Sequence, residues 1–202
     1  MCFQLAFRVN AVLLLILFAR QSNGLIYRFI PEDDEFFEDC DNAPSNALNL
    51  HGFVDTSQIS FSRNNGIITV SGNTTAIWNI KPGDRIEGKA VMFQYDRGIW
   101  RPTQFSVTVR NCCAVIYDKP QYWYKYWTQH ITNREEIKDQ CFYPGTKMIY
   151  EPFEIDVLMQ FTGLPLNGRY KIVTTFRAFD KRNVQRDTII CLQTVGEFER
   201  LD

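Results

Sequence analysis

Residues 111–141 read NCCAVIYDKPQYWYKYWTQHITNREEIKDQC, and this stretch decides how the rest of the chain is interpreted. It opens on the adjacent cysteines Cys112 and Cys113, contains the most aromatic run of the sequence at residues 122–127, and closes on Cys141. The segments on both sides alternate as β-strands do, so the stretch is predicted to be an insert tied at its base. If the protein holds an apolar molecule, we expect this insert to be its entrance or its lid.

The insert is predicted to be helical over about residues 118–140. Large apolar side chains recur every four residues, as on one face of an amphipathic helix, at Trp123, Trp127 and Ile131. Asp118 is a favoured residue type at a helix start. Residues 132–135 read TNRE, the spacing of a capping box, which predicts a second short helix before Cys141.

The flanking segments predict an all-β domain. Apolar and polar residues alternate in several short runs separated by turn residues, at 67–70, 85–95, 105–109, 153–161 and 170–177. Asn64, Asn65 and Gly66 form a hairpin turn signal directly before the first of these runs. The alternation of Phe105, Val107 and Val109 with polar residues predicts a strand with one buried face. Many short strands with one helical insert predict a β-sandwich.

The N-terminal residues 1–24 are predicted to be a secretory signal peptide. Arg8 precedes an apolar run at 11–19 that is too short to span a bilayer, and small residues follow it. We therefore expect a secreted, extracellular protein whose residues 25–202 form a single domain. Residues 25–46 are rich in Asp and Glu and are predicted to form a solvated acidic arm.

Composition argues against several classes of protein. The formal net charge of −1 leaves no strongly basic face, so nucleic acid is not an expected partner. With two histidines and no C-x-x-C pair, no metal site and no cofactor are expected. The sequence also lacks a G-x-S-x-G nucleophile motif, so we expect the protein not to be an enzyme.

Cysteine and asparagine positions predict covalent modification. Five cysteines remain after the signal, which in an oxidising compartment predicts two disulfides and one leftover thiol. That thiol is either buried and inert, shared with another chain, or an alternative partner within the Cys112–Cys113 pair. Asn73-Thr74-Thr75 is an N-glycosylation sequon, which predicts a glycan at Asn73 in an exposed turn.

Four sequence motifs have the order and spacing found in one protein family. The motifs are the run Asn111–Val115, Cys141 followed by Pro144 and Gly145, Pro165 with the run Gly168–Ile172, and Cys191 with Leu192. Over roughly residues 40–198 the chain resembles the ML lipid-recognition domain, and within it the ganglioside activator protein and the insect CheB-type chemosensory proteins.

The resemblance implies an immunoglobulin-like two-sheet β-cup whose sheets splay apart at one end to accept acyl chains. It implies a disulfide between Cys40 and Cys191 and another that ties Cys141 to the cysteine pair, with Cys113 favoured over Cys112 by position. The residues expected at the ligand cavity and its rim are Phe105, Trp123, Tyr126, Trp127, Phe161, Tyr170 and Phe176.

By this resemblance the protein is expected to be a secreted, non-enzymatic binding protein for a hydrophobic small molecule or lipid. The implied setting is insect chemosensation, such as pheromone perception, with a membrane receptor or channel as a further partner. Two alternatives stay open. One is an extracellular module that docks on another protein through the aromatic insert and a basic set, formed by Arg169, Lys171, Arg177, Lys181, Arg182 and Arg186. The other interpretation of this basic set is a solvated surface with no role in binding. The second alternative is a glycolipid-extracting activator of a hydrolase.

Overall fold

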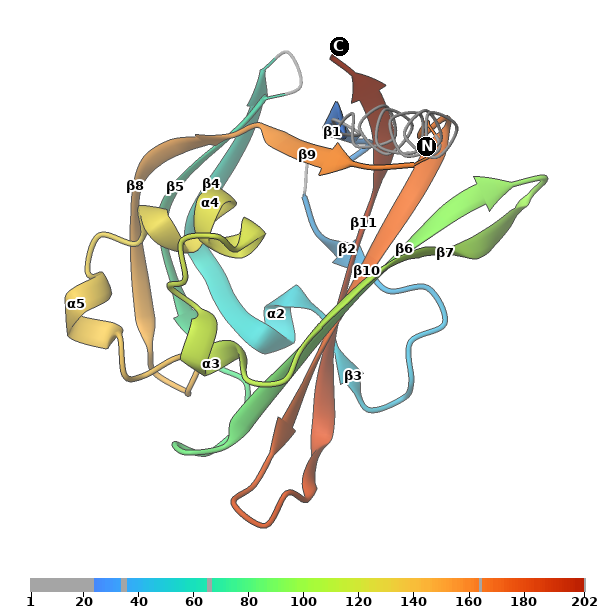
Figure 1. Ribbon diagram of the computed structural model, residues 1–202. Helices are drawn as coiled ribbons and strands as arrows, with labels where there is room; N and C mark the ends of the chain where they lie inside the picture. The colour runs from blue at the N-terminus through green and yellow to red at the C-terminus, as the bar shows by residue number, and fades with distance from the viewer. Residues whose placement is uncertain (1–23, 34–35, 65–66, 164, 202) are drawn as a thin grey trace, which may run out of the picture.

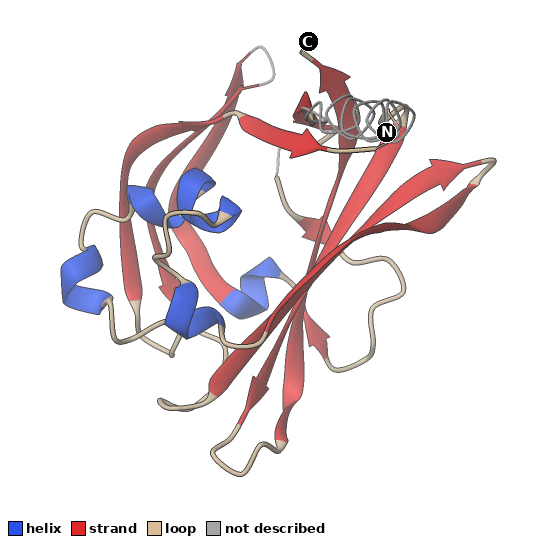
Figure 2. Ribbon diagram, in the orientation of Figure 1, coloured by secondary structure: helices blue, strands red, loops and turns tan. Residues whose placement is uncertain are grey.

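Strands make up most of the described chain, and its helices are short (Figure 2). The computed structural model describes residues 24–33, 36–64, 67–163 and 165–201. Its strands are β1 Leu25–Pro31, β2 Glu38–Asp39, β3 Ala47–Leu48, β4 Val54–Asn64, β5 Ile67–Ala76, β6 Arg85–Asp96, β7 Ile99–Val109, β8 Lys147–Ile155, β9 Val157–Phe161, β10 Arg169–Phe179 and β11 Gln185–Arg200. Its helices are α2 Leu50–Phe53, α3 Cys112–Val115, α4 Tyr122–Tyr126, the 3-10 turn η1 Thr128–His130 and α5 Arg134–Ile137. The predicted signal peptide and the turn at Asn65 and Gly66 lie outside the described residues.

Two sheets face each other across the core (Figure 1). The larger sheet has the strand order β7-β6-β10-β11-β1-β9, with β2 and β3 pairing short stretches of β11. The smaller sheet has the order β4-β5-β8, and α3 and α4 lie between it and the β6–β7 side of the larger sheet in the view of Figure 1. The prediction of an all-β, two-sheet sandwich or cup with a small helical insert is confirmed.

The larger sheet curls far enough to bring its two ends together. β7 and β9 lie at opposite ends of the strand order, yet the rings of Phe105 and Phe161, one from each strand, have centroids 4.9 Å apart. The ring of Phe161 continues to that of Phe198 on β11, 5.4 Å away. A sheet twisted and curled in this way forms the wall of a cup rather than a flat layer, and in the described chain β7 and β9 meet through side chains without pairing.

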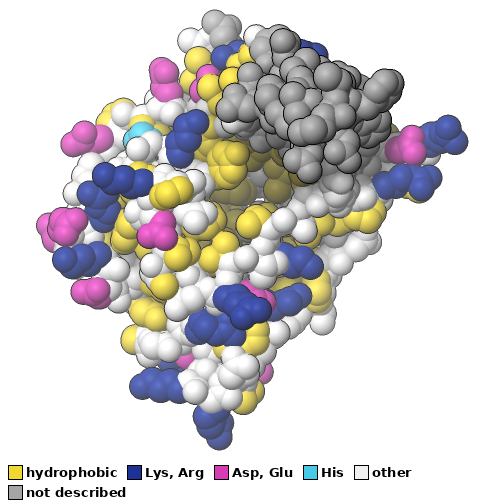
Figure 3. Space-filling view, in the orientation of Figure 1, with side chains coloured by type: hydrophobic (Ala, Val, Ile, Leu, Met, Phe, Trp, Pro, Cys, Tyr) yellow, Lys and Arg dark blue, Asp and Glu magenta, His cyan; other side chains and the backbone are white. Residues whose placement is uncertain are grey.

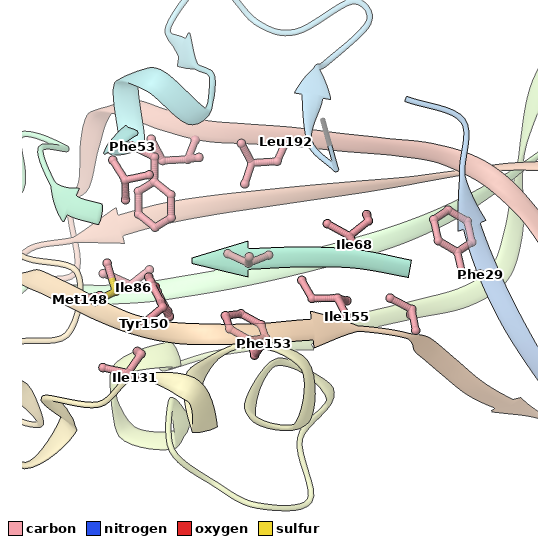
Figure 4. Close-up of a cluster of buried hydrophobic side chains, with 14 of the residues drawn as sticks. Phe29, Phe53, Ile68, Ile86, Ile131, Met148, Tyr150, Phe153, Ile155 and Leu192 are labelled. Carbon is pink, nitrogen blue, oxygen red and sulfur yellow. Dashed lines mark hydrogen bonds between the residues drawn. The ribbon is translucent and has the colours of Figure 1, made fainter. Parts of the chain in front are cut away.

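The core fills the space between the smaller sheet and the middle of the larger one. Buried side chains from both sheets point toward one another there (Figure 4), among them Phe29, Phe53, Ile68, Ile86, Ile131, Met148, Tyr150, Phe153, Ile155 and Leu192. Most of them lie on strands, where alternation predicts one buried face, whereas Phe53 lies on α2 and Ile131 lies in the insert.

The prediction of a solvated arm over residues 25–46 is wrong for its first part. Residues Leu25–Pro31 form β1, which pairs on one side with β11 and on the other with β9. Tyr27 and Phe29 are buried in the core because β1 lies inside the sheet. Farther along the segment, Glu38 and Asp39 form β2, which pairs with β11.

The prediction of a regular helix over much of residues 118–140 is also wrong. The insert consists of separate short turns, and α4 ends before Trp127, whose backbone φ of −142° and ψ of −70° are not helical. The predicted second helix is present as α5, which begins after Asn133. Between the two, Ile131 forms a bridge with Tyr150 of β8, so this part of the insert continues the smaller sheet.

Both disulfides implied by the family resemblance are present. Cys40 is bonded to Cys191, and Cys113 is bonded to Cys141, which leaves Cys112 as the free thiol. Two disulfides in a chain of this size are typical of extracellular proteins. Among the described residues, no helix has the length and apolar composition needed to cross a membrane.

Candidate functional site

The inner face of the larger sheet remains partly open to solvent at its β7 end. Val107 lies opposite Ala90 on β6, and Ala90 shares its face of the strand with the fully buried Ile86. Val107 therefore points into the sandwich. Even so, 53 % of its surface is exposed. The prediction that the inner face of this strand is buried is wrong at Val107, because nothing in the described chain covers it.

Neighbouring inward-facing side chains on the same strands are also only partly buried. We call this surface the open cup and define it by Ala90, Phe105, Val107, Ile172, Thr174 and Phe176. The space-filling view shows apolar side chains around a hollow between the helical insert and the larger sheet (Figure 3). No member of the open cup carries a charge, so the surface suits an uncharged apolar group.

Aromatic rings close the open cup at the end where β7 meets β9. Phe105 packs edge-on against Phe161, and Phe161 against Phe198. The ring of Tyr170 lies 5.2 Å from that of Phe198. The structure therefore brings together three of the predicted ligand residues, Phe105, Phe161 and Tyr170, through a fourth ring that the prediction did not include.

A second aromatic group closes the opposite end, at the base of the insert. Phe176 stacks on Phe53 at 5.5 Å, and both rings contact Phe142, which follows the disulfide-bonded Cys141. Gly88 makes this packing possible, since a Cβ atom there would lie 2.8 Å from the Cys112 sulfur. The base of the insert is thus fixed both covalently and by close contact.

The predicted aromatic residues of the insert form anchors within the fold. The hydroxyl of Tyr126 accepts a hydrogen bond from the Leu158 N–H at 2.9 Å and donates one to the Leu158 carbonyl. The Trp127 indole N–H donates to the Tyr150 hydroxyl at 3.1 Å. The indole of Trp123 donates within the insert, to the Val115 carbonyl at 3.1 Å. Tyr126 and Trp127 therefore bind the insert to β9 and to the smaller sheet beside the open cup.

Burial shifts the ionisation of the groups around the core. It raises the pKa of the Cys112 thiol to about 11 and that of the Tyr150 hydroxyl to about 12. A thiol with so high a pKa is protonated at neutral pH and is a poor nucleophile. Burial lowers the pKa of His130, whose ring stacks on Phe153 at 4.0 Å. These groups are therefore neutral at neutral pH, in keeping with the apolar surroundings.

Most of the predicted basic set is engaged in ion pairs. Lys171 is buried on the outer face of the larger sheet, bonded to Asp41 at 2.9 Å and set over the ring of Trp100. Arg169 pairs with Glu32 in the same acidic segment. Hydrogen bonds from Lys171 lower the pKa of Asp41, and those from Arg186 lower the pKa of the buried Asp84. These cations hold the acidic segment and the loop before β6 in place, which gives them a structural role.

The predicted glycosylation site lies in a strand. Asn73 belongs to β5, where it pairs with Gln58 on one side and Ile149 on the other, so the prediction of an exposed turn is wrong. The neighbouring Thr74 points inward and is buried, whereas Asn73 lies on the outer face of the smaller sheet and is partly exposed. A glycan on Asn73 stays a prediction, and it would project away from the open cup.

Four residues of the open cup were absent from the predicted ligand residues: Ala90, Val107, Ile172 and Thr174. Val107 is two residues from the predicted Phe105, and Ile172 and Thr174 are four and two residues from the predicted Phe176. The two-residue period of a strand could therefore have placed them on the same face. Within the described ranges, no cluster of His, Cys, Asp or Glu side chains has an arrangement that could hold a metal ion. Neither a protein-family model nor a curated protein sequence matches this chain.

Proposed function

We propose that the protein is a non-enzymatic carrier that binds an uncharged apolar molecule in the open cup. The observation that carries the proposal is Val107, which points into the sandwich by its register yet is 53 % exposed. An inward-facing apolar side chain of a soluble domain is normally covered by other apolar groups. A ligand that covers Val107 and its neighbours gains roughly 25 cal/mol for each Å² of apolar surface removed from water.

The chemistry of the open cup favours a neutral ligand over an ionised one. The residues that define it offer hydrocarbon and aromatic surface, and Thr174 offers one hydroxyl. Transfer of an unpaired carboxylate into such a surface is costly, because no cation is present there to replace its hydration. An acyl chain, a long-chain hydrocarbon or a neutral ester meets these requirements, and a charged headgroup would have to remain outside.

The insert is the element that would admit the ligand. Its base is fixed by the Cys113–Cys141 disulfide and by Phe142, whereas the part of the insert beside β9 is tied to that strand by the two hydrogen bonds of the Tyr126 hydroxyl. Local opening is expected where few contacts have to be broken. We therefore assign the entrance for the ligand to the part of the insert around Tyr126, beside β9.

The setting of this carrier is proposed from the sequence motifs. The signal sequence and the disulfides support secretion. The order of the cysteine, Pro-Gly and Gly-x-Tyr-x-Ile motifs supports an ML-type lipid-binding domain of the insect chemosensory kind, with a hydrophobic pheromone as ligand and a receptor or channel in a membrane as partner.

Native mass spectrometry of protein secreted from insect cells tests the proposal. We expect extra mass that organic extraction removes, and renewed uptake of a long-chain hydrocarbon or methyl ester but not of the matching carboxylate. Ala90→Phe should fill the open cup and abolish uptake, whereas Ala114→Phe, at an exposed position on α3, should not. A single ligand-free mass with no uptake of any apolar probe would overturn the proposal and favour docking through the insert.

A further inference from the structure

The outermost strand of the larger sheet has an open edge. β7 pairs with β6 on one side, and in the described part of the chain no strand pairs with its other side. Sheet edges are usually protected by charged side chains, proline or a bulge. β7 has Pro102 and an irregular register between Pro102 and Ser106, but the regularly paired stretch from Ser106 to Val109 has none of these features.

The sequence of this stretch is complementary to itself. Residues 105–109 read FSVTV, with Val107 at the centre. If two copies paired antiparallel about Val107, each Val107 would face the other, and Ser106 would face Thr108 of the second copy on the opposite side of the sheet. Pairs of β-branched residues and pairs of hydroxyl residues are favourable cross-strand neighbours.

The edge is also accessible. Ser106 and Thr108 are exposed on the outer face, and Val107 is 53 % exposed on the inner face. In the described part of the chain, no strand is hydrogen-bonded to this edge. The isolated, neutral edge and its self-complementary sequence are independent observations, and both favour a second copy of this chain as the partner.

We propose that β7 pairs antiparallel with β7 of a second copy about a two-fold axis through Val107. The larger sheets of the two copies become one continuous sheet, and the exposed sides of their open cups meet at the axis. Such an interface is closed, because the same patch serves both copies, so the product is a dimer and not a fibre. The pairing depends on the strand alone and does not require that the cup holds a ligand.

Two double variants of the full chain test the pairing, because they differ only in the sign of one charge. Ser106→Glu with Thr108→Lys places opposite charges across the axis twice, whereas Ser106→Lys with Thr108→Lys places like charges there. Both residues are exposed on the outer face, so neither variant alters the core or the cup. Sedimentation velocity over a wide concentration range should show a reversible wild-type dimer, about fivefold tighter association for the first variant, and a monomer for the second.

Oxidative cross-linking tests the symmetry. Val107→Cys should give a disulfide-linked dimer, whereas Val184→Cys, at a position with 55 % exposure in the β10–β11 loop, should not. A wild-type protein that sediments as a monomer at every concentration overturns the proposal. Equal association of the two charged variants, or equal cross-linking at positions 107 and 184, overturns it as well.

Discussion

The inner faces of the two sheets have the same apolar alternation but differ in how far they are buried. On the smaller sheet, Ile68, Val70 and Ile155 are almost fully buried, because the larger sheet and the insert cover them. On the β7 end of the larger sheet, Phe105 and Val107 face the same interior but are reached by solvent. One region therefore supplies most of the stability, and the other offers apolar surface that a ligand or a partner can cover.

This difference means that a similar truncation should have opposite consequences in the two regions. Stability is lost where a side chain is replaced by a cavity, and binding is lost where a side chain forms part of an uncovered surface. Matched substitutions on the two sheets separate these effects, since the residue type and the change are the same.

The largest effect is expected at Phe153, which packs between Trp127, Tyr150 and His130 in the covered region. Phe153→Ala should reduce the free energy of unfolding by about 4 kcal/mol, measured by urea denaturation. Phe105→Ala, in the open cup, should cost about 1 kcal/mol, since the side chain is only partly buried. Apolar-probe uptake should fall for Phe105→Ala. Equal losses of stability would show that the two regions are packed alike.

A valine pair sharpens the same comparison with less disturbance. Val70 and Val107 both lie on strands and point inward, but Val70 is 0 % exposed and Val107 is 53 % exposed. Val70→Ala should cost about 2 kcal/mol and Val107→Ala less than about 0.5 kcal/mol, measured in parallel by thermal and urea unfolding. If Val107→Ala were as destabilising as Val70→Ala, a covering element for the open cup would have to exist.

The sequence predicts the strands better than it predicts what covers them. Alternation identifies an inner face, as for Phe105 and Val107, but whether that face is covered depends on a distant element. β1 was missed because the acidic residues after it dominate the composition. Its own signal, the alternation of Tyr27 and Phe29 with Ile26 and Arg28, was present.

Long-range contacts also explain the errors at the insert. Recurrence of Trp123, Trp127 and Ile131 every four residues predicts a continuous helix. The chain leaves helical geometry at Trp127, where the indole bonds to Tyr150, and Ile131 joins the edge of β8. These tertiary contacts override a local preference of a few tenths of a kcal/mol per residue. The family resemblance implied cavity or rim positions for Phe105, Phe161, Phe176 and Trp123, of which the structure places the first three on strands of the larger sheet and Trp123 within the insert.

The boundary between the two regions can be loosened at Tyr126. Its hydroxyl makes two hydrogen bonds to the backbone of Leu158 at the start of β9. Tyr126→Phe removes both and leaves the ring in place, so it should cost about 1 kcal/mol. Because the entrance is assigned to this boundary, release of a bound apolar probe should also become faster, measured by stopped-flow fluorescence. Tyr122→Phe is the control, since Tyr122 is 50 % exposed at the tip of the insert. Unchanged release in Tyr126→Phe would place the entrance elsewhere.

The smallest effect concerns pH and the covered region. Burial lowers the pKa of His130 below its value of about 6.5 in the unfolded chain. The unfolded state therefore binds a proton first as the pH falls, and stability is lost between the unfolded and folded pKa values. His130→Phe keeps the ring that stacks on Phe153 and removes the titration, so its unfolding midpoint should change less than that of the wild type as the pH falls from about 7.5 to 5.5. His51→Gln, at an exposed position on α2, should retain the wild-type dependence. If His51→Gln instead removed it, the exposed α2 region rather than the covered one would carry the response to mild acid.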